Sequence, residues 1–126
     1  MTTTRDEIRL EVPAQPEYGR LARVTVAGLA LRLGFSHTEV EDLRLAVDEG
    51  LILLLDGSGH DGDVEVVYRL LDDAIEVELT ANLGRGVPPP SDGAIDRFRR
   101  MAADLVDVAV ADPAKRVVRF RKARRT

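Results

Sequence analysis

The pattern of apolar and polar positions predicts alternating strands and helices. Apolar and charged residues alternate over residues 8–12, which is typical of a half-buried strand, and Pro13 ends the alternation. Pro16 suits the start of a helix, and Gly34 suits the position just after its end. Between these two residues, apolar side chains recur at helical spacing. They are Leu21, Val24, Gly28 and Leu31.

A second helix is predicted up to about Leu55. Ser36 and Glu39 have the spacing of a capping box, in which each residue bonds the other's backbone at a helix N-terminus. Residues 56–59, Asp-Gly-Ser-Gly, form a turn signal that ends this helix. One helical stripe is apolar throughout and predicts the core-facing side. It consists of Val40, Leu43, Val47, Leu51 and Leu54.

The second half of the chain predicts two hairpins around a third helix. Strands over 64–68 and 75–79 flank Asp72-Asp73, and a loop rich in glycine and proline spans 82–93. Ser91 or Asp92 would cap a helix over 94–105. Strands over 106–110 and 116–121 follow. The order predicts one α+β domain over 1–126, a two-layer sandwich with helices on one face of a mixed, mostly antiparallel sheet.

Composition narrows the function classes. The 126 residues are 44% hydrophobic with a formal net charge of -4, as in an ordinary globular domain. The absence of cysteine excludes disulfides and thiol catalysis, and His37 and His60 are too few for a histidine-based metal site. The longest apolar run, 51–55, is far too short to span a membrane, and the N-terminus lacks the apolar core of a signal peptide. We therefore expect a cytoplasmic protein.

Positive charge is concentrated at the C-terminus. Residues 115–126 carry seven of the 18 basic side chains and no acidic one. One hypothesis is that this basic tail binds nucleic acid or an acidic partner. The simpler interpretation is a last strand over 116–121, with its polar face in water and a frayed end, because the acidic remainder of the chain would repel a phosphate backbone.

Three segments carry a family resemblance. Residues 12–18 with 22–28, and residues 34–49, resemble the anti-sigma-factor serine kinases of the GHKL ATPase superfamily in motif, order and spacing. The third segment, Ala81-Asn82-Leu83-Gly84, stands before a loop, where that family has an Asp-x-Gly motif after a strand. The resemblance implies a histidine kinase-like ATPase fold of the Bergerat type. In that family ATP lies between the helices and the sheet under a glycine-rich lid.

The sequence departs from the family's nucleotide site. Glu49 stands where the family has the glutamate that orients or activates the attacking group, yet Leu53 replaces the asparagine that ligates Mg²⁺. Asn82 replaces the aspartate that binds adenine, whereas Gly84 keeps its glycine. Residues 94–97 replace the lid glycines. We therefore expect no metal site, and ATP with Mg²⁺ only if the altered site still binds. For Glu49 alone, a solvated acidic residue at a helix end is the simpler interpretation.

The first helix is the stronger candidate for function. Arg23 falls on a position where the family uses an arginine to contact partners, and Arg20 lies one turn earlier on the same face. Two solvated arginines on an amphipathic helix are the alternative.

The resemblance implies an anti-sigma-factor-like regulator without kinase activity. It would bind an alternative sigma factor, an anti-anti-sigma protein of the STAS type, or both, and a homodimer is expected. An active ATP-dependent serine/threonine kinase that phosphorylates the anti-anti-sigma factor is the alternative. Nucleic-acid binding by the tail is a weaker one, and no direct nucleic-acid contact is expected.

Overall fold

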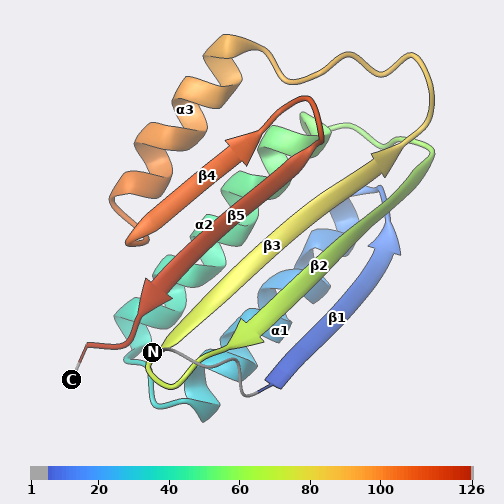
Figure 1. Cartoon of the computed structure of the whole chain (residues 1–126). Coiled ribbons are helices and arrows are strands. Elements are labelled where there is room, and N and C mark those ends of the chain that lie inside the picture. Colours follow the sequence, from blue (N-terminus) through green and yellow to red (C-terminus); the bar gives the residue numbers. More distant parts are fainter. Residues whose placement is uncertain (1–5, 126) are drawn as a thin grey trace.

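The chain folds into two layers. The computed structural model describes residues 6–125, which form a five-stranded sheet with its helices packed on one face (Figure 1). The strands are β1 (Asp6–Pro13), β2 (Gly62–Leu70), β3 (Ala74–Leu83), β4 (Val108–Asp112) and β5 (Val117–Ala123). The helices are the 3-10 turn η1 (Pro16–Tyr18), α1 (Gly19–Arg32), α2 (His37–Leu55) and α3 (Asp92–Ala103).

The strand order is β1-β2-β3-β5-β4. The α+β sandwich with helices on one face is confirmed, but the described sheet is not mixed, because each of its strand pairs is antiparallel. The connections explain the difference. Two helices, not one, join β1 to β2, so the chain reverses direction once more than in a parallel crossover. β2 and β3 form one hairpin, and β4 and β5 form another. β3 and β5 are neighbours in the sheet, although α3 and β4 lie between them in the chain.

Alternation along the central strands builds the core. Val66 and Tyr68 of β2 and Leu79 of β3 point at the helix layer and are fully buried, as are Leu43 and Val47 of α2. Burying such side chains supplies most of the stabilisation of a domain of this size. The Tyr68 hydroxyl donates to the carbonyl of Ala22 at 2.9 Å and so ties β2 to α1. Burial raises the pKa of this hydroxyl, so it stays a donor.

The predicted ends of α2 are confirmed. The backbone N–H of Glu39 donates to Ser36 Oγ at 3.2 Å, and the N–H of Ser36 donates to Glu39 Oε1 at 2.8 Å, which completes the capping box. Asp56 follows the last turn in the left-handed conformation, with φ 52°. Gly34, after α1, has φ 85° and fits its predicted position.

Three apolar side chains that recur at helical spacing in α1 lie on its outer side. Leu21, Val24 and Leu31 are 49%, 59% and 52% exposed, whereas the core receives the smaller residues of the opposite face. Those buried residues are Ala22, Val26 and Ala30. The small side chains let α1 approach the sheet and α2 closely. The apolar outer face is therefore free for another molecule.

The remaining boundaries differ from the predictions by a few residues. Ser91 caps α3, because its Oγ accepts from the N–H of Ala94 at 3.1 Å, and α3 ends before Leu105. β4 begins after Val106. Within residues 6–125, none of the helices combines the length and the apolar character that a membrane span requires.

The basic tail is a structural element as far as residue 125. β5 extends to Ala123, beyond the predicted end. Lys122 is buried and donates from Nζ to the carbonyl of Leu105 at 2.7 Å. Arg124 Nη1 donates to the carbonyl of Leu33 at 2.6 Å, and the N–H of Arg125 donates to Glu39 at 2.8 Å. The expected last strand is thus present, but the expectation of a frayed end is wrong as far as residue 125, because these bonds attach it to both N-terminal helices.

Candidate functional site

Glu49 is buried and paired rather than solvated. Its residue surface is 8% exposed, because α3 packs over this turn of α2. Arg97 of α3 donates from Nη1 to Oε1 of Glu49, and from Nη2 to Oε2 at 3.4 Å. A guanidinium that addresses both oxygens of a carboxylate fixes the geometry as well as the charge. The solvated interpretation of Glu49 is therefore wrong: the carboxylate is held by a cation from the chain itself.

Leu53 continues the same side of α2 one turn later. It is buried and lies beside Glu49 in a small cavity of about 120 Å³ between α2 and α3, which Arg97 and Phe98 also line. A leucine side chain offers no oxygen to a hard cation such as Mg²⁺. The expected position of the metal ligand is thus occupied by hydrocarbon.

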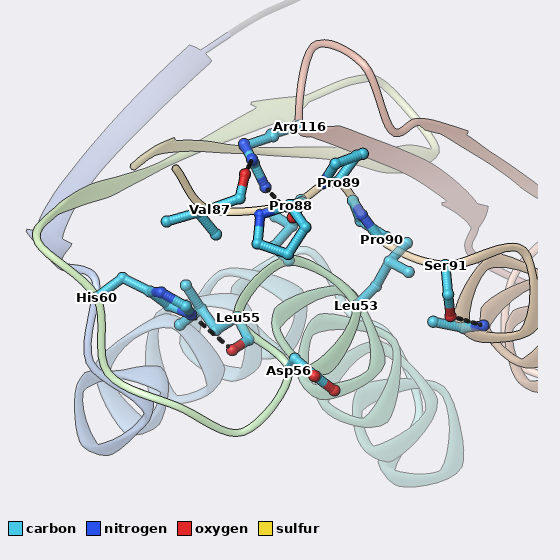
Figure 2. Close-up of a pocket in the computed structure, with 12 residues that line it drawn as sticks. Leu53, Leu55, Asp56, His60, Val87, Pro88, Pro89, Pro90, Ser91 and Arg116 are labelled. Carbon is cyan, nitrogen blue, oxygen red and sulfur yellow. Dashed lines mark hydrogen bonds between the residues drawn. The ribbon is translucent and has the colours of Figure 1, made fainter. Parts of the chain in front are cut away.

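A larger pocket of about 360 Å³ opens at the C-terminal end of α2 (Figure 2). Leu53 and Leu55 form one wall, and residues 87–91, which include three prolines, form the opposite wall. Arg116 holds this loop by donating to the carbonyls of Val87 and Pro88, at 3.2 Å for Pro88. The volume is at the lower end of small-molecule sites, which span about 300–1,000 Å³.

His60 is a pocket residue that the sequence did not single out. Its Nε2 lies 3.0 Å from the carbonyl of Leu55, so the ring closes the end of α2. Figure 2 shows this imidazole and the Asp56 carboxylate at the rim, below the proline loop. The pocket walls are mainly apolar.

Asn82 and Gly84 do not line this pocket. In β3, Leu79 and Ala81 face the helices, so the alternation turns Asn82 toward the open face of the sheet. There its amide nitrogen donates to Asp63 Oδ1 at 2.9 Å. Gly84 is exposed and bonds through its N–H to the carbonyl of Asp61 at 3.1 Å. The structure brings Glu49 and Leu53 together but leaves these two residues apart, and their assignment to an adenine site stays a prediction.

The residues do not fit a magnesium nucleotide. Glu49 already binds Arg97, Leu53 has no ligand atom, and Asn82 faces the other side of the sheet. Within the described residues, no group of three or more histidine and acidic side chains could hold a metal ion. Arg97 was not predicted, because its role depends on how α3 packs against α2 and no local motif signals that contact.

The two arginines of α1 differ in their surroundings. Arg23 Nη1 pairs with Asp48 Oδ1 of α2 at 2.8 Å and is half-buried. Arg20 is exposed and makes no ion pair within the described residues. It accompanies the exposed apolar residues of the helix, and we call this set the outer α1 face. The outer α1 face consists of Arg20, Leu21, Val24 and Leu31.

A shallow apolar pocket adjoins α1 on α2. It holds about 60 Å³ and lies between Pro16 of η1 and Leu51 and Ile52 of α2. Ile52 is itself exposed. The helix layer therefore presents apolar surface next to its ion pair between Arg23 and Asp48.

Comparison with known proteins gives consistent relatives. No family model matches the chain. Serine-protein kinase RsbW of Listeria innocua serovar 6a is 38% identical over 85 residues, which are 65% of this chain and 54% of that protein. Serine-protein kinase RsbW of Bacillus velezensis is 35% identical over 80 residues, which are 61% of this chain and 50% of that protein. The chain thus spans about half the length of the curated relatives it matches.

A solved structure supports the fold. The crystal structure of the RsbU and RsbW domains of Rv1364c from Mycobacterium tuberculosis matches 95% of this chain and 32% of that chain, with a TM-score of 0.67 and 17% sequence identity. At this identity the match establishes the architecture alone. The resemblance to the anti-sigma-factor serine kinases is thereby confirmed: this chain is a relative of proteins named serine-protein kinase RsbW and has their GHKL-type fold.

Proposed function

We propose that this chain is an anti-sigma-factor-like regulator that acts by binding proteins rather than by phosphorylating them. The observation that carries the proposal is the outer α1 face, where Leu21, Val24 and Leu31 are exposed beside Arg20. Large apolar side chains that recur along one exposed helix face mark a binding surface. The partners would be an alternative sigma factor, a STAS-type anti-anti-sigma protein, or both.

The buried end of α2 argues against the kinase function. Phosphoryl transfer depends on a metal ion and on donors that neutralise the phosphates. Here Arg97 neutralises Glu49, and Leu53 fills the position of the metal ligand. The loop that faces α2 is proline-rich and held by Arg116, so it offers few backbone N–H groups to a phosphate.

Inhibition would then follow from occlusion. A sigma factor that covers Leu21 and Val24 with its own apolar side chains would not be available to RNA polymerase. Arg20 would meet a carboxylate of the partner, since a guanidinium pairs best with a carboxylate. Such a regulator would act in the cytoplasm, and an anti-anti-sigma protein would release the sigma factor by competing for the same face.

Negative charges introduced on the outer α1 face test the proposal. Titration calorimetry with purified alternative sigma factors of the source organism should detect a binding partner. The variants Arg20→Glu and Val24→Asp should each weaken binding at least about tenfold, because each places a negative charge in the interface. Arg44→Glu, on an exposed part of α2, is the matched control and should bind normally. Unchanged affinity for both α1 variants would exclude this face.

An active kinase is the second candidate, because the relatives are named serine-protein kinases and Glu49 lies beside a pocket. Incubation with radiolabelled ATP, Mg²⁺ and a STAS-type protein would give a labelled product that Glu49→Gln abolishes. Absence of label would remove this candidate. The expected homodimer stays a prediction, and sedimentation velocity would test it.

A further inference from the structure

The two edges of the sheet are built differently. Strand β1 carries charged side chains at Glu7, Arg9 and Glu11 and ends at Pro13, which is how proteins prevent unwanted strand pairing. Strand β4 begins with four uncharged residues, Val-Ala-Val-Ala, and lacks proline. The β4 edge is therefore less protected than β1, since its charge and the proline that follows it, Asp112 and Pro113, stand at the end of the strand.

Backbone groups of β4 are available for pairing. Among the described residues only β5 pairs with β4, so the other side of the strand has no backbone partner. Val108 and Val110 are 55% and 47% exposed on the open face. An extended segment could therefore continue the sheet at this edge through main-chain hydrogen bonds.

Grooves flank β4 on both faces of the sheet. On the helix side, a cavity of about 250 Å³ lies between α3 and β4 and is lined by three alanines, a valine and two charged residues. Its lining residues are Arg99, Ala102, Ala103, Val106, Asp107 and Ala109. On the open face, a cavity of about 320 Å³ is lined by apolar, acidic and basic side chains of β3, β4, β5 and the β4–β5 turn. They are Glu78, Val110, Asp112, Lys115, Val117 and Arg119. The side chains of an added strand would alternate between these two grooves. The helix-side groove fits small residues.

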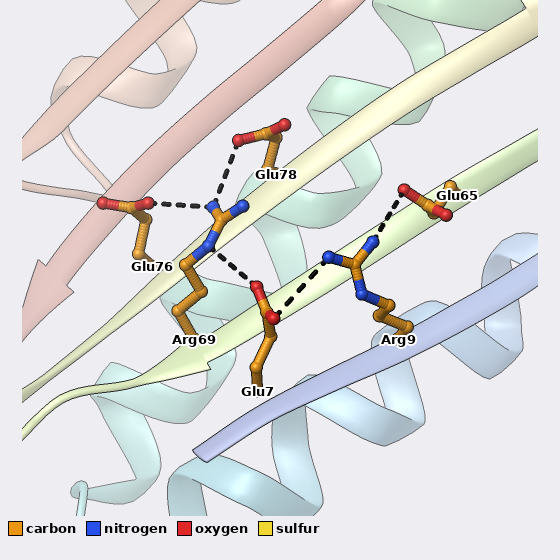
Figure 3. Close-up of polar contacts among 6 residues, drawn as sticks. All are labelled: Glu7, Arg9, Glu65, Arg69, Glu76 and Glu78. Atoms are coloured by element: carbon orange, nitrogen blue, oxygen red, sulfur yellow. Dashed lines mark hydrogen bonds and ion pairs between the residues drawn. The ribbon is translucent and has the colours of Figure 1, made fainter. Parts of the chain in front are cut away.

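The charges on the open face indicate which side chains of an added strand would face the open groove. Elsewhere on that face the arginines are paired: Arg69 contacts Glu7, Glu76 and Glu78 at 3.0–3.2 Å, and Arg9 contacts Glu65 at 3.4 Å (Figure 3). Beside β4, Arg119 and Arg121 lie opposite Glu78 and Glu76 of β3, but both of these glutamates bond Arg69. Within the described residues, no ion pair is formed by Arg119, Arg121 or Lys115 of the β4–β5 turn.

We propose that the β4 edge binds an extended acidic segment of a partner protein as an additional strand. Acidic side chains of the segment would meet Arg119 and Arg121, while small or apolar ones would enter the groove beside α3. A second copy of this chain is a poorer occupant, because its β4 offers Val108 and Val110 to the open face and carries Asp112 as its one acidic residue. This surface is distinct from the outer α1 face and does not depend on the proposed function.

A synthetic peptide in which glutamate alternates with valine tests the proposal on the full chain. Fluorescence anisotropy would measure binding, and amide NMR would locate it. We expect shift changes and slower amide exchange in residues 108–112. Arg119→Glu should weaken binding at least about fivefold, as expected for reversing one exposed charge contact. A peptide in which lysine replaces glutamate should then prefer the Arg119→Glu variant.

The matched control is Arg44→Glu on α2, which carries the same charge change far from β4 and should bind as the unmodified chain does. Circular dichroism would verify that both variants are folded. Three results would overturn the proposal. They are absence of binding, perturbations located at β1 or α1, and an affinity that Arg119→Glu leaves unchanged.

Discussion

One arginine determines what the buried end of α2 can do. Arg97 reaches from α3 to both carboxylate oxygens of Glu49, which would otherwise be an unpaired charge in a closed environment. Burying a charge without a partner is costly, so the pair stabilises the packing of α3 on α2. Leu53, one turn away, is also buried there.

Removal of Arg97 should therefore destabilise the protein. Arg97→Ala leaves Glu49 buried and unpaired, and we expect a loss of about 1–2 kcal/mol in the free energy of unfolding, since Arg97 itself is partly exposed and its charge is screened. Urea unfolding measures this. Arg99→Ala, on the exposed side of the same helix, is the control. Glu49→Gln in the Arg97→Ala background should recover part of the loss, and an additive second loss would contradict the pairing.

At the scale of elements, one glycine fixes the approach of β2 to β3. Gly62 begins β2 with φ 115°, and a Cβ at this position would lie 1.9 Å from the carbonyl oxygen of Asn82. Only glycine therefore allows the strand to start at this register. Gly86, in the loop after β3, has φ 87° but no atom within 4 Å of such a Cβ.

The two glycines form a matched pair of substitutions. Gly86→Ala should cost about 1 kcal/mol for its positive φ alone. Gly62→Ala should cost at least about 3 kcal/mol, because the backbone of Asn82 must also move. Thermal unfolding of both variants compares them directly. Equal losses would show that the contact with Asn82 has no energetic consequence.

The elements also show how far a sequence alone leads. The start and end of α2 were predicted because their signals are local: the capping box of Ser36 and Glu39 and the glycine-rich turn. The orientation of α1 was not, because this helix is apolar on two faces and periodicity does not say which one is buried. The ion pair between Glu49 and Arg97 was not predicted either, since it joins residues 48 positions apart through the packing of two helices.

At the scale of the whole molecule, Glu39 joins the start of α2 to the C-terminal segment that follows β5. Its carboxylate accepts from the backbone N–H of Ser36 and of Arg125, with Lys122 nearby. Burial opposes ionisation, but these donors hold the pKa of Glu39 below its usual value. Stability from this group is therefore complete above the unfolded carboxyl pKa, about 4.3, and is lost as pH falls through the lower folded value.

Glu39→Gln should reduce this dependence on pH. Compared with the unmodified chain, the variant should be less stable at about pH 7 and lose less stability between about pH 5 and pH 3. Urea unfolding across this range provides the measurement. Glu41→Gln, exposed on the same turn, should leave the profile unchanged. A variant profile parallel to that of the unmodified chain would show that Glu39 does not contribute.

The central claim is that Arg97 and Leu53 close the nucleotide site, so that the protein regulates by binding partners alone. The most direct measurement is the melting temperature of the purified chain with and without millimolar ATP and Mg²⁺. A ligand that binds the folded state raises the melting temperature, and the rise grows with the logarithm of the ligand concentration once this exceeds Kd. We predict no change. A rise of several degrees that Glu49→Gln or EDTA removes would contradict the account and indicate a working nucleotide site.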